Sequence, residues 1–276
     1  MKIRKFLYWL LVAILSATMV ISGTVLVHYM IDTLQQKKEY HNLAAQVDQH
    51  RQEALAQTVP AAPSPMLPQE SLEDTPEQLP EAPTEPTILP EYAALYEKNS
   101  DLVGWMTIDG TPIHYPVMQS PDRVDFYLDH NFEGQKNSHG CLYVRESCDV
   151  FAPSDNLTIY GHHMRNGSMF AGLDNFRDKE FYEEYSSIRF DTLYERHTYT
   201  VFAVFTTTAS VGKGFTYHLF EDAADEAEFQ DFVSACKSLS LYETGITPVY
   251  GDKLICLSTC EYSQNNGRLV VAAVRD

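Results

Sequence analysis

Three scarcities in the sequence limit what the chain can do. Cations are few, since 20 Lys and Arg stand against 38 Asp and Glu in 276 residues and give a formal net charge of −18. Because binding of a phosphate backbone needs clustered cations, this balance argues against a nucleic acid partner. The five cysteines are too few for a fold built on disulfides, and no Cys-x-x-Cys or His-Glu-x-x-His spacing occurs. We therefore expect no metal and no cofactor.

The third scarcity is local: residues 6–30 contain no Lys, Arg, Asp or Glu. A helix of this length crosses a hydrocarbon layer of roughly 30 Å. Lys2, Arg4 and Lys5 precede the run and are expected to stay in the cytoplasm. We predict that residues 1–30 form a cytoplasmic tip and a single-pass membrane anchor, with the rest of the chain outside the cell. The alternative is a cleaved signal peptide, whose apolar region is usually shorter.

Two segments separate this anchor from the folded part of the chain. Residues 31–58 carry only a thin apolar stripe, which predicts a solvated stalk helix. Residues 59–91 hold nine of the 14 prolines and seven acidic residues, without any Lys or Arg. Such a composition favours an extended extracellular linker, which at about 3.1 Å per residue would span up to roughly 100 Å.

Residues 92–276 read as one folded domain. Asp109-Gly110 lies between two apolar runs and predicts a hairpin turn. The segments rich in β-branched and aromatic residues predict strands at 102–108, 113–117, 140–144, 157–160, 187–193, 198–208, 253–260 and 268–274. Helices are expected at 92–98, 168–176, 179–185 and 221–239. Many short strands with few helices predict a mainly β barrel.

The residues with catalytic chemistry gather at the last predicted hairpin. Cys260 ends one strand and Arg268 begins the next, so pairing of the strands would place them about 5 Å apart. Arginine cannot act as a base, but it can donate hydrogen bonds to a developing oxyanion and favour the thiolate. A cysteine nucleophile also needs an acid–base partner. His162 follows a predicted strand and Gly161, a position at which functional groups often occur.

The other cysteines are expected to be core thiols. Cys256 lies roughly 13 Å from Cys260 along the same strand, too far for a disulfide. Cys141, Cys148 and Cys236 read as buried, with a Cys141–Cys148 bridge as the alternative. His163 should point away from its neighbour His162 in an extended backbone and serve in packing or hydrogen bonding.

Four segments together resemble a sortase. They are Asn-Leu-Thr-Ile-Tyr-Gly-His-His-Met (156–164), Ser-Met-Phe (168–170), Leu-Ser-Thr-Cys-Glu (257–261) and Arg-Leu-Val-Val (268–271). The opening segment 104–119 and the predicted helix at 221–239 resemble class B sortases in particular. The resemblance covers about residues 92–276 and implies an eight-stranded barrel with a few peripheral helices.

The resemblance also implies the site and the reaction. The family's histidine, cysteine and arginine correspond to His162, Cys260 and Arg268. Ser258 and the backbone N–H of Glu261 are weaker candidates for binding substrate. The implied enzyme is a cysteine transpeptidase that cleaves the sorting signals of secreted proteins after Thr, within a motif such as Asn-Pro-x-Thr or a relative of Pro-x-Thr-Gly. The acceptor would be an amine of a peptidoglycan precursor or a pilin lysine.

Two other functions stay open on the residues alone. A cysteine peptidase would use the same side chains and release the acyl group to water. A non-catalytic surface binding module would keep the barrel without the chemistry.

Overall fold

The computed structural model describes residues 2–58, 86–210 and 212–276, which form two compact units divided between Ala45 and Gln46. The predicted anchor and the predicted stalk are one continuous helix, α1 (Lys2–Thr58). Its N-terminal part reaches a mean hydropathy of 2.4 over 18 residues, and in the described ranges it is the one helix long and apolar enough to cross a membrane.

The second unit includes the last turns of α1 together with the barrel. Arg51 of α1 pairs with Glu91 of α2 and Asp191 of β5, two carboxylates that are buried. The helix is thus tied to the barrel by side-chain contacts within this unit. Most of the predicted linker, residues 59–85, lies outside the described residues, and its role as an extended spacer remains a prediction from composition.

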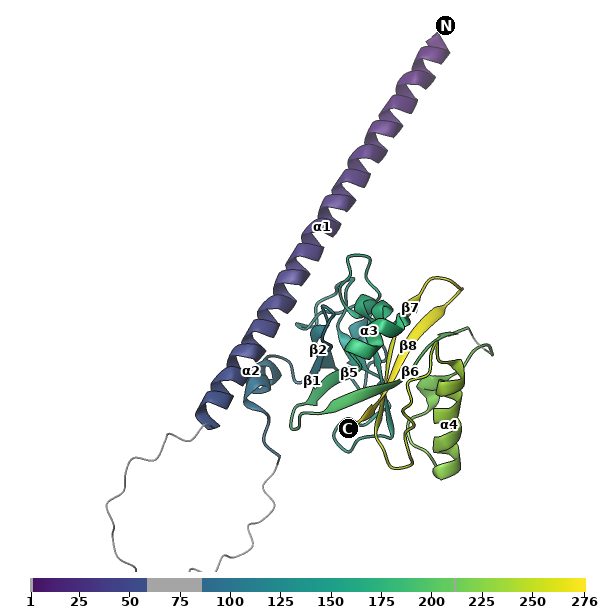
Figure 1. The fold of residues 1–276 in the computed structure, drawn as a ribbon. Coiled ribbons are helices and arrows are strands. Elements are labelled where there is room, and N and C mark those ends of the chain that lie inside the picture. The colour runs from purple at the N-terminus through teal and green to yellow at the C-terminus, as the bar shows by residue number, and fades with distance from the viewer. Residues whose placement is uncertain (1, 59–85, 211) are drawn as a thin grey trace, which may run out of the picture. The chain divides into compact units, whose positions relative to one another are not determined.

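Eight strands close into a barrel in the order β1-β2-β3-β4-β7-β8-β6-β5, which confirms the predicted mainly β architecture. The strands are β1 (Leu102–Thr107), β2 (His114–Met118), β3 (Leu142–Val144), β4 (Asn156–Tyr160), β5 (Ser187–Thr192), β6 (Thr198–Thr208), β7 (Leu254–Glu261) and β8 (Gly267–Arg275). The helical segments after α1 are α2 (Pro90–Lys98), η1 (Phe126–Leu128), η2 (Phe170–Arg177), α3 (Lys179–Glu184), η3 (Tyr217–Leu219) and α4 (Glu226–Leu239). Figure 1 shows β7 and β8 at the yellow end of the chain, and the green strand β6 pairs with β8.

The predicted turns and strands agree closely with these bounds. The hairpin between β1 and β2 turns at Asp109-Gly110, where Gly110 adopts a φ of 75° that a side chain would strain. The helix α2 begins at Pro90, two residues earlier than expected and inside the predicted linker. Proline is favoured in the first turn of a helix, because the missing N–H would have no partner there.

The helix predicted at 221–239 begins later than expected, because two acidic residues make other contacts. Glu221 pairs with Arg145, and Asp222 accepts a hydrogen bond from the backbone N–H of Asp155. The side chain of Asp225 then accepts from the N–H of Glu228 and caps α4, so that the helix starts at Glu226.

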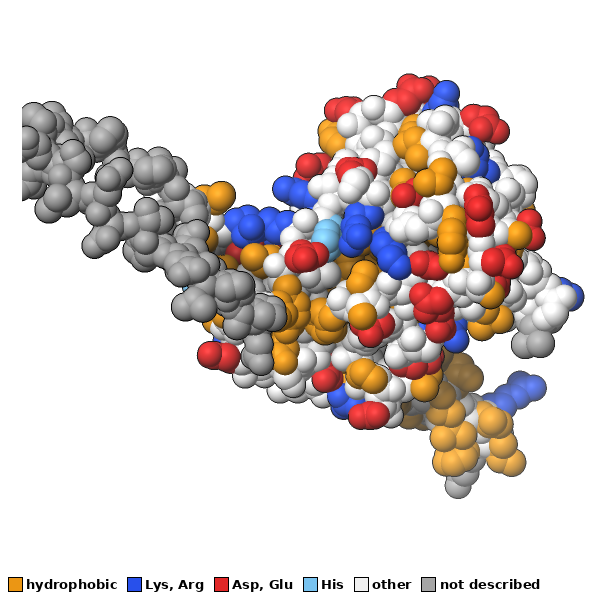
Figure 2. All heavy atoms as spheres, turned by 90° about the horizontal axis from the view of Figure 1, so that it is seen from below, with side chains coloured by type: hydrophobic (Ala, Val, Ile, Leu, Met, Phe, Trp, Pro, Cys, Tyr) orange, Lys and Arg blue, Asp and Glu red, His pale blue; other side chains and the backbone are white. Residues whose placement is uncertain are grey.

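The core beneath α4 is aromatic and continuous with the strands that carry Cys260 and Arg268. Phe229 and Phe232 of α4 pack with Phe202 and Phe205 of β6 and with buried residues of β7 and β8. This packing fixes the three strands as one rigid wall. On the face seen from below in Figure 2, acidic and basic side chains are interspersed with hydrophobic ones, so the net negative charge of the chain is not concentrated there.

The direction of the strands determines where their ends meet. β4 runs parallel to β7, whereas β7 and β6 are both antiparallel to β8. The C-terminal ends of β4, β6 and β7 and the start of β8 therefore share one rim of the barrel.

Candidate active site

Cys260 and Arg268 are cross-strand partners on this rim. The ladder between β7 and β8 pairs Cys260 directly with Arg268, followed by Glu261 with Gly267. Opposite residues in an antiparallel pair have Cβ atoms about 5 Å apart. The thiol is partly exposed, in contrast to the four other cysteines, which are buried. The sequence-based expectation that the two residues share one edge of the barrel is confirmed.

The guanidinium of Arg268 is held by backbone and remains available to a ligand. Its Nη1 donates to the carbonyl oxygen of Gly267 at 2.9 Å and, at 3.4 Å, to that of Asn266. Among the described residues no carboxylate forms an ion pair with it. Its remaining N–H groups are therefore free to bind an anion beside the thiol.

His162 follows the end of β4 at the rim of the barrel where β7 ends with Cys260 and Glu261. Tyr160 pairs with Ser258 in the parallel ladder, and the N–H of Gly161 donates to the carbonyl of Ser258 at 3.2 Å. This register ends at Tyr160, two residues before His162, and its partner Ser258 lies two residues before Cys260. A Cβ at Gly161 would lie 2.5 Å from Leu142 Cδ2 and 2.7 Å from Phe170 Cδ2, so only glycine allows the strand to pass here.

The ring of His162 is oriented by a backbone carbonyl. Its Nε2 lies 2.7 Å from the carbonyl oxygen of Leu128. Since a carbonyl only accepts, Nε2 must carry the proton in this contact, which leaves Nδ1 as the nitrogen that can exchange a proton. The N–H of Phe170 donates to the backbone oxygen of His162 at 2.9 Å and fixes the turn after β4.

His163 points to different partners from His162, as the extended backbone predicts. Its Nε2 lies 2.6 Å from Oδ2 of Asp174, and its ring contacts Tyr262 edge-on. It is thus a hydrogen-bonding residue, as expected. It also lines the cavity that borders Cys260, a position that the sequence did not predict.

That cavity has a volume of about 260 Å³ and is lined by His163, Asp174, Arg177, Cys260, Glu261 and Tyr262. Burial by itself raises the pKa of the Glu261 carboxyl, but hydrogen bonds from Ser263 and the charge of Arg177 outweigh it and lower that pKa. Glu261 is consequently an anion beside the thiol at neutral pH. The predicted use of its backbone N–H as an oxyanion donor remains a proposal.

Ser258 lies deeper than a substrate-binding group would be expected to lie. It is 1% exposed, and its Oγ lies 2.6 Å from the hydroxyl of Tyr217. Burial raises the pKa of Tyr217 to about 12. The charge of Arg268 lowers this pKa and the charge of Cys260 raises it, so the phenol lies within electrostatic reach of both side chains. Tyr217 was missed by the sequence analysis, because it lies in η3, about forty residues away along the chain from the cysteine, with no motif around it.

The remaining cysteines are core thiols. Cys141, Cys148, Cys236 and Cys256 are buried and form no disulfide, so the alternative of a Cys141–Cys148 bridge is wrong. Burial raises the pKa of the Cys148 thiol to about 11 and also raises those of Cys236 and Cys256. Over the described ranges of the chain, no group of three or more His, Cys, Asp or Glu side chains is placed to hold a metal ion.

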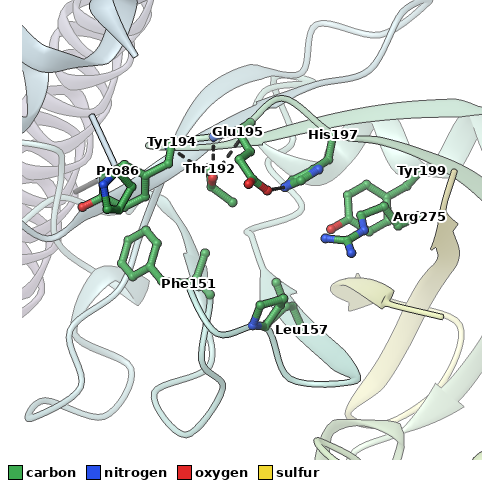
Figure 3. A pocket seen from close by; sticks show the side chains of 11 residues that line it. Pro86, Phe151, Leu157, Thr192, Tyr194, Glu195, His197, Tyr199 and Arg275 are labelled. Carbon is green, nitrogen blue, oxygen red and sulfur yellow. Dashed lines mark hydrogen bonds and ion pairs between the residues drawn. The ribbon is translucent and has the colours of Figure 1, made fainter. Parts of the chain in front are cut away.

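A second cavity, of about 240 Å³, lies at the other end of the barrel (Figure 3). Its wall comes from the start of β4 and β6 and the end of β5 and β8. The rings of Phe151 and Tyr194 meet edge-on at 5.3 Å, and His197 Nε2 lies 3.3 Å from Glu195. Because these strand ends lie at the rim away from Cys260, this cavity is separate from the candidate active site.

Comparisons with known proteins agree with this combination of fold and site. The model of the Sortase domain family matches residues 106–276. The chain is 32% identical over 183 residues to Sortase B of Listeria monocytogenes, which covers 66% of this chain and 72% of that protein. A crystal structure of sortase B from Bacillus anthracis in complex with AAEK1 superposes with a TM-score of 0.67 at 28% identity, covering 89% of this chain and 98% of the other.

A further solved structure, sortase B complexed with triglycine, superposes with a TM-score of 0.69 at 24% identity over 88% of this chain and 98% of the other, which supports the fold. The family match and the Sortase B relatives show that the protein is a cysteine transpeptidase. The chain belongs to the sortase family, and its relatives place it in class B.

Proposed function

We propose that this transpeptidase acts through Cys260, Arg268 and His162 on the C-terminal sorting signals of secreted proteins. The observation that carries the proposal is the direct pairing of Cys260 with Arg268 at the rim where β4 delivers His162. The proposed reaction has two halves, acylation of the cysteine and transfer of the acyl group to an amine.

In the first half, the thiolate of Cys260 attacks the carbonyl carbon of Thr in the sorting motif. The carbonyl oxygen becomes an anion, and the free N–H groups of Arg268 stabilise it. A fixed donor is effective here because it needs no reorganisation when the charge develops. The neighbouring charge of Arg268 also favours the thiolate over the thiol.

His162 moves the protons. As an imidazolium it protonates the leaving amine from Nδ1, while Nε2 stays on the carbonyl of Leu128. The thioester then remains on Cys260. In the second half, the acceptor amine gives a proton to Nδ1 and replaces the sulfur, which restores the thiolate.

The acceptor is proposed to be an amine of a peptidoglycan precursor or a pilin lysine. The relative that was solved with triglycine supports a short peptide amine as the chemical type. The motif cleaved is proposed to resemble Asn-Pro-x-Thr or a Pro-x-Thr-Gly variant, as the family resemblance implies.

The location of the enzyme follows from α1. We propose that residues 6–30 span the membrane once, with residues 1–5 in the cytoplasm and the barrel outside the cell, where it meets secreted proteins. The apolar helix supports a membrane span, and the basic N-terminus supports this orientation.

The test is to incubate the full chain in detergent with a sorting-motif peptide, with and without an amine, and to analyse Cys260 by mass spectrometry. An acyl adduct on Cys260 and an amine-linked product support the proposal. Hydrolysis alone at every amine concentration would instead support a peptidase. If Cys260→Ala retained turnover, the assignment of the nucleophile would be wrong.

A further inference from the structure

The cavity beside Cys260 contains a carboxylate that the acylation steps do not use. The side chain of Asp174 is 45% exposed, whereas that of Glu261 is 7% exposed. Both line the same cavity as the thiol of Cys260. Asp174 is therefore the accessible anion next to the sulfur at which the thioester forms.

Asp174 is held in place from two sides. His163 Nε2 donates to Oδ2 at 2.6 Å, and Arg177 Nε donates to Oδ1 at 3.1 Å. Each carboxylate oxygen can accept a second hydrogen bond. Asp174 is thus oriented by its neighbours and still able to bind a cation from the cavity.

Glu261 is less available than Asp174. Its Oε1 accepts from the N–H of Ser263 and its Oε2 from the hydroxyl of Ser263, both at 2.8 Å, and Arg177 lies 3.4 Å from Oε1. The cavity is thus lined by two carboxylates and one guanidinium, so carboxylates outnumber arginines in its wall. A negative, partly enclosed site attracts cations.

We propose that this cavity is the acceptor subsite and that Asp174 selects a primary amine in its ammonium form. The inference rests on the proposed role of Cys260 as the nucleophile. The volume of the cavity, about 260 Å³, admits the end of an unbranched chain, such as a terminal glycine or a lysine side chain. Both of these acceptors carry an ammonium group, and the experiment below distinguishes them.

The attraction between the Asp174 carboxylate and the ammonium assists binding of the acceptor and does not assist its reaction. A carboxylate stabilises the ammonium, so it holds the acceptor in its unreactive form. Before attack, the ammonium must lose one proton to solvent water and become the neutral amine. As the nitrogen bonds to the thioester carbon, it gives a second proton to His162 Nδ1, the C–S bond breaks, and its electron pair leaves with the sulfur as thiolate. Asp174 is therefore a specificity-determining residue whose loss raises the KM for the amine without lowering kcat.

The test compares a charged and an uncharged acceptor. The Asp174→Asn variant of the full chain is assayed in detergent with triglycine and with hydroxylamine, which is neutral at pH 7. We expect the KM for triglycine to rise about tenfold, the scale of one lost charge-assisted hydrogen bond. The KM for hydroxylamine and the rate of hydrolysis without amine should stay unchanged. Nα-blocked lysine forms a second arm, and the larger rise in KM identifies which acceptor fits the cavity.

Two variants serve as controls. Asp174→Glu keeps the charge and should restore much of the affinity for triglycine. Glu180→Gln removes an exposed carboxylate from the neighbouring helix α3 and should change neither KM. Should Asp174→Asn fail to fold, the wild type still gives an answer, because added NaCl should raise the KM for triglycine and leave that for hydroxylamine unaltered.

The outcomes separate the two proposals. Equal changes in KM for both acceptors in Asp174→Asn, or no change for either, would overturn the acceptor subsite. Detection of acylated Cys260 in the same experiment would leave the proposed nucleophile in place. Absence of any acyl adduct on Cys260 of the wild type would overturn the proposed nucleophile, and the subsite with it.

Discussion

The hydroxyl of Thr259 donates a hydrogen bond to the carbonyl oxygen of Gly161 at 2.8 Å. Thr259 directly precedes Cys260 and Gly161 directly precedes His162. One side chain, 2% exposed, therefore ties together the two backbone segments that carry the proposed nucleophile and the proposed acid–base residue. The bond fixes the spacing of these segments where the regular ladder between β4 and β7 ends.

Loss of the Thr259 hydroxyl should lower kcat by more than the loss of unfolding free energy alone would explain. Thr259→Val keeps the side-chain shape but leaves a buried carbonyl without its donor, which costs about 1–3 kcal/mol of unfolding free energy. Because misplacement of catalytic groups by about 1 Å can cost about 10²-fold, we expect kcat to fall at least tenfold. Thr259→Ser retains the donor and is the matched control. Equal kcat values for the valine and serine variants, measured by peptide cleavage, would contradict this role.

Arg268 should not tolerate the most conservative change. Lysine keeps the charge but lacks the planar set of donors, one of which already binds the carbonyl of Gly267. By the scale of lost oxyanion donors, Arg268→Lys should reduce kcat by about 10²-fold or more with little change in Tm. Arg275→Lys, at the far end of the same strand, is the control and should retain activity. A near wild-type kcat for Arg268→Lys would remove the role assigned to that side chain.

Thiol labelling should single out Cys260. It is the one partly exposed cysteine, and burial raises the pKa values of Cys148, Cys236 and Cys256. Because the thiolate is the reactive form, iodoacetamide at pH 7 should modify one thiol per folded chain. Intact-mass measurement should show one adduct on the wild type and none on Cys260→Ala. Any adduct on the folded Cys260→Ala variant, or a second adduct on the folded wild type, would show that a core cysteine is accessible.

Local patterns were sufficient to predict the strands and the facing pair Cys260 and Arg268. The turn at Asn265-Asn266 lies between β7 and β8 and leads into the pairing of Glu261 with Gly267, and alternation along the strand separates His162 from His163. The pairing of β4 with β7 is parallel and joins segments nearly a hundred residues apart, so no local signal reveals it. For this reason the sequence indicates His162 by its place after a strand end and by its motif, and not by its proximity to Cys260.

Contacts made by single side chains were beyond prediction. Asp174 and Tyr217 approach the cysteine from η2 and η3, short segments whose place depends on packing around the barrel. Likewise, nothing in the thin apolar stripe of the predicted stalk indicates that Arg51 reaches two buried carboxylates. A polar residue with partners distant in sequence has no periodic pattern.

The cluster around Glu91 should make stability depend on the last turns of α1. Glu91 is fully buried, and its Oε1 accepts from Arg196 and from Arg51. Burial raises its pKa, but a backbone hydrogen bond and the two arginines outweigh that effect and lower the pKa below its usual value. Removing one partner of a buried ion pair costs about 3–5 kcal/mol, so Arg51→Met should destabilise the barrel substantially.

The pH dependence distinguishes this ionic contribution from packing. Since the pKa of Glu91 is lower in the folded chain, its contribution to stability is present above the unfolded pKa of about 4.5. It is lost as the pH falls through the lower, folded value. Urea unfolding of the full chain in detergent between pH 7 and pH 3 should show this decline in the wild type. Glu91→Gln should be less stable at pH 7 and decline less towards pH 3. Parallel curves for the two proteins would show that the Glu91 charge does not stabilise the fold.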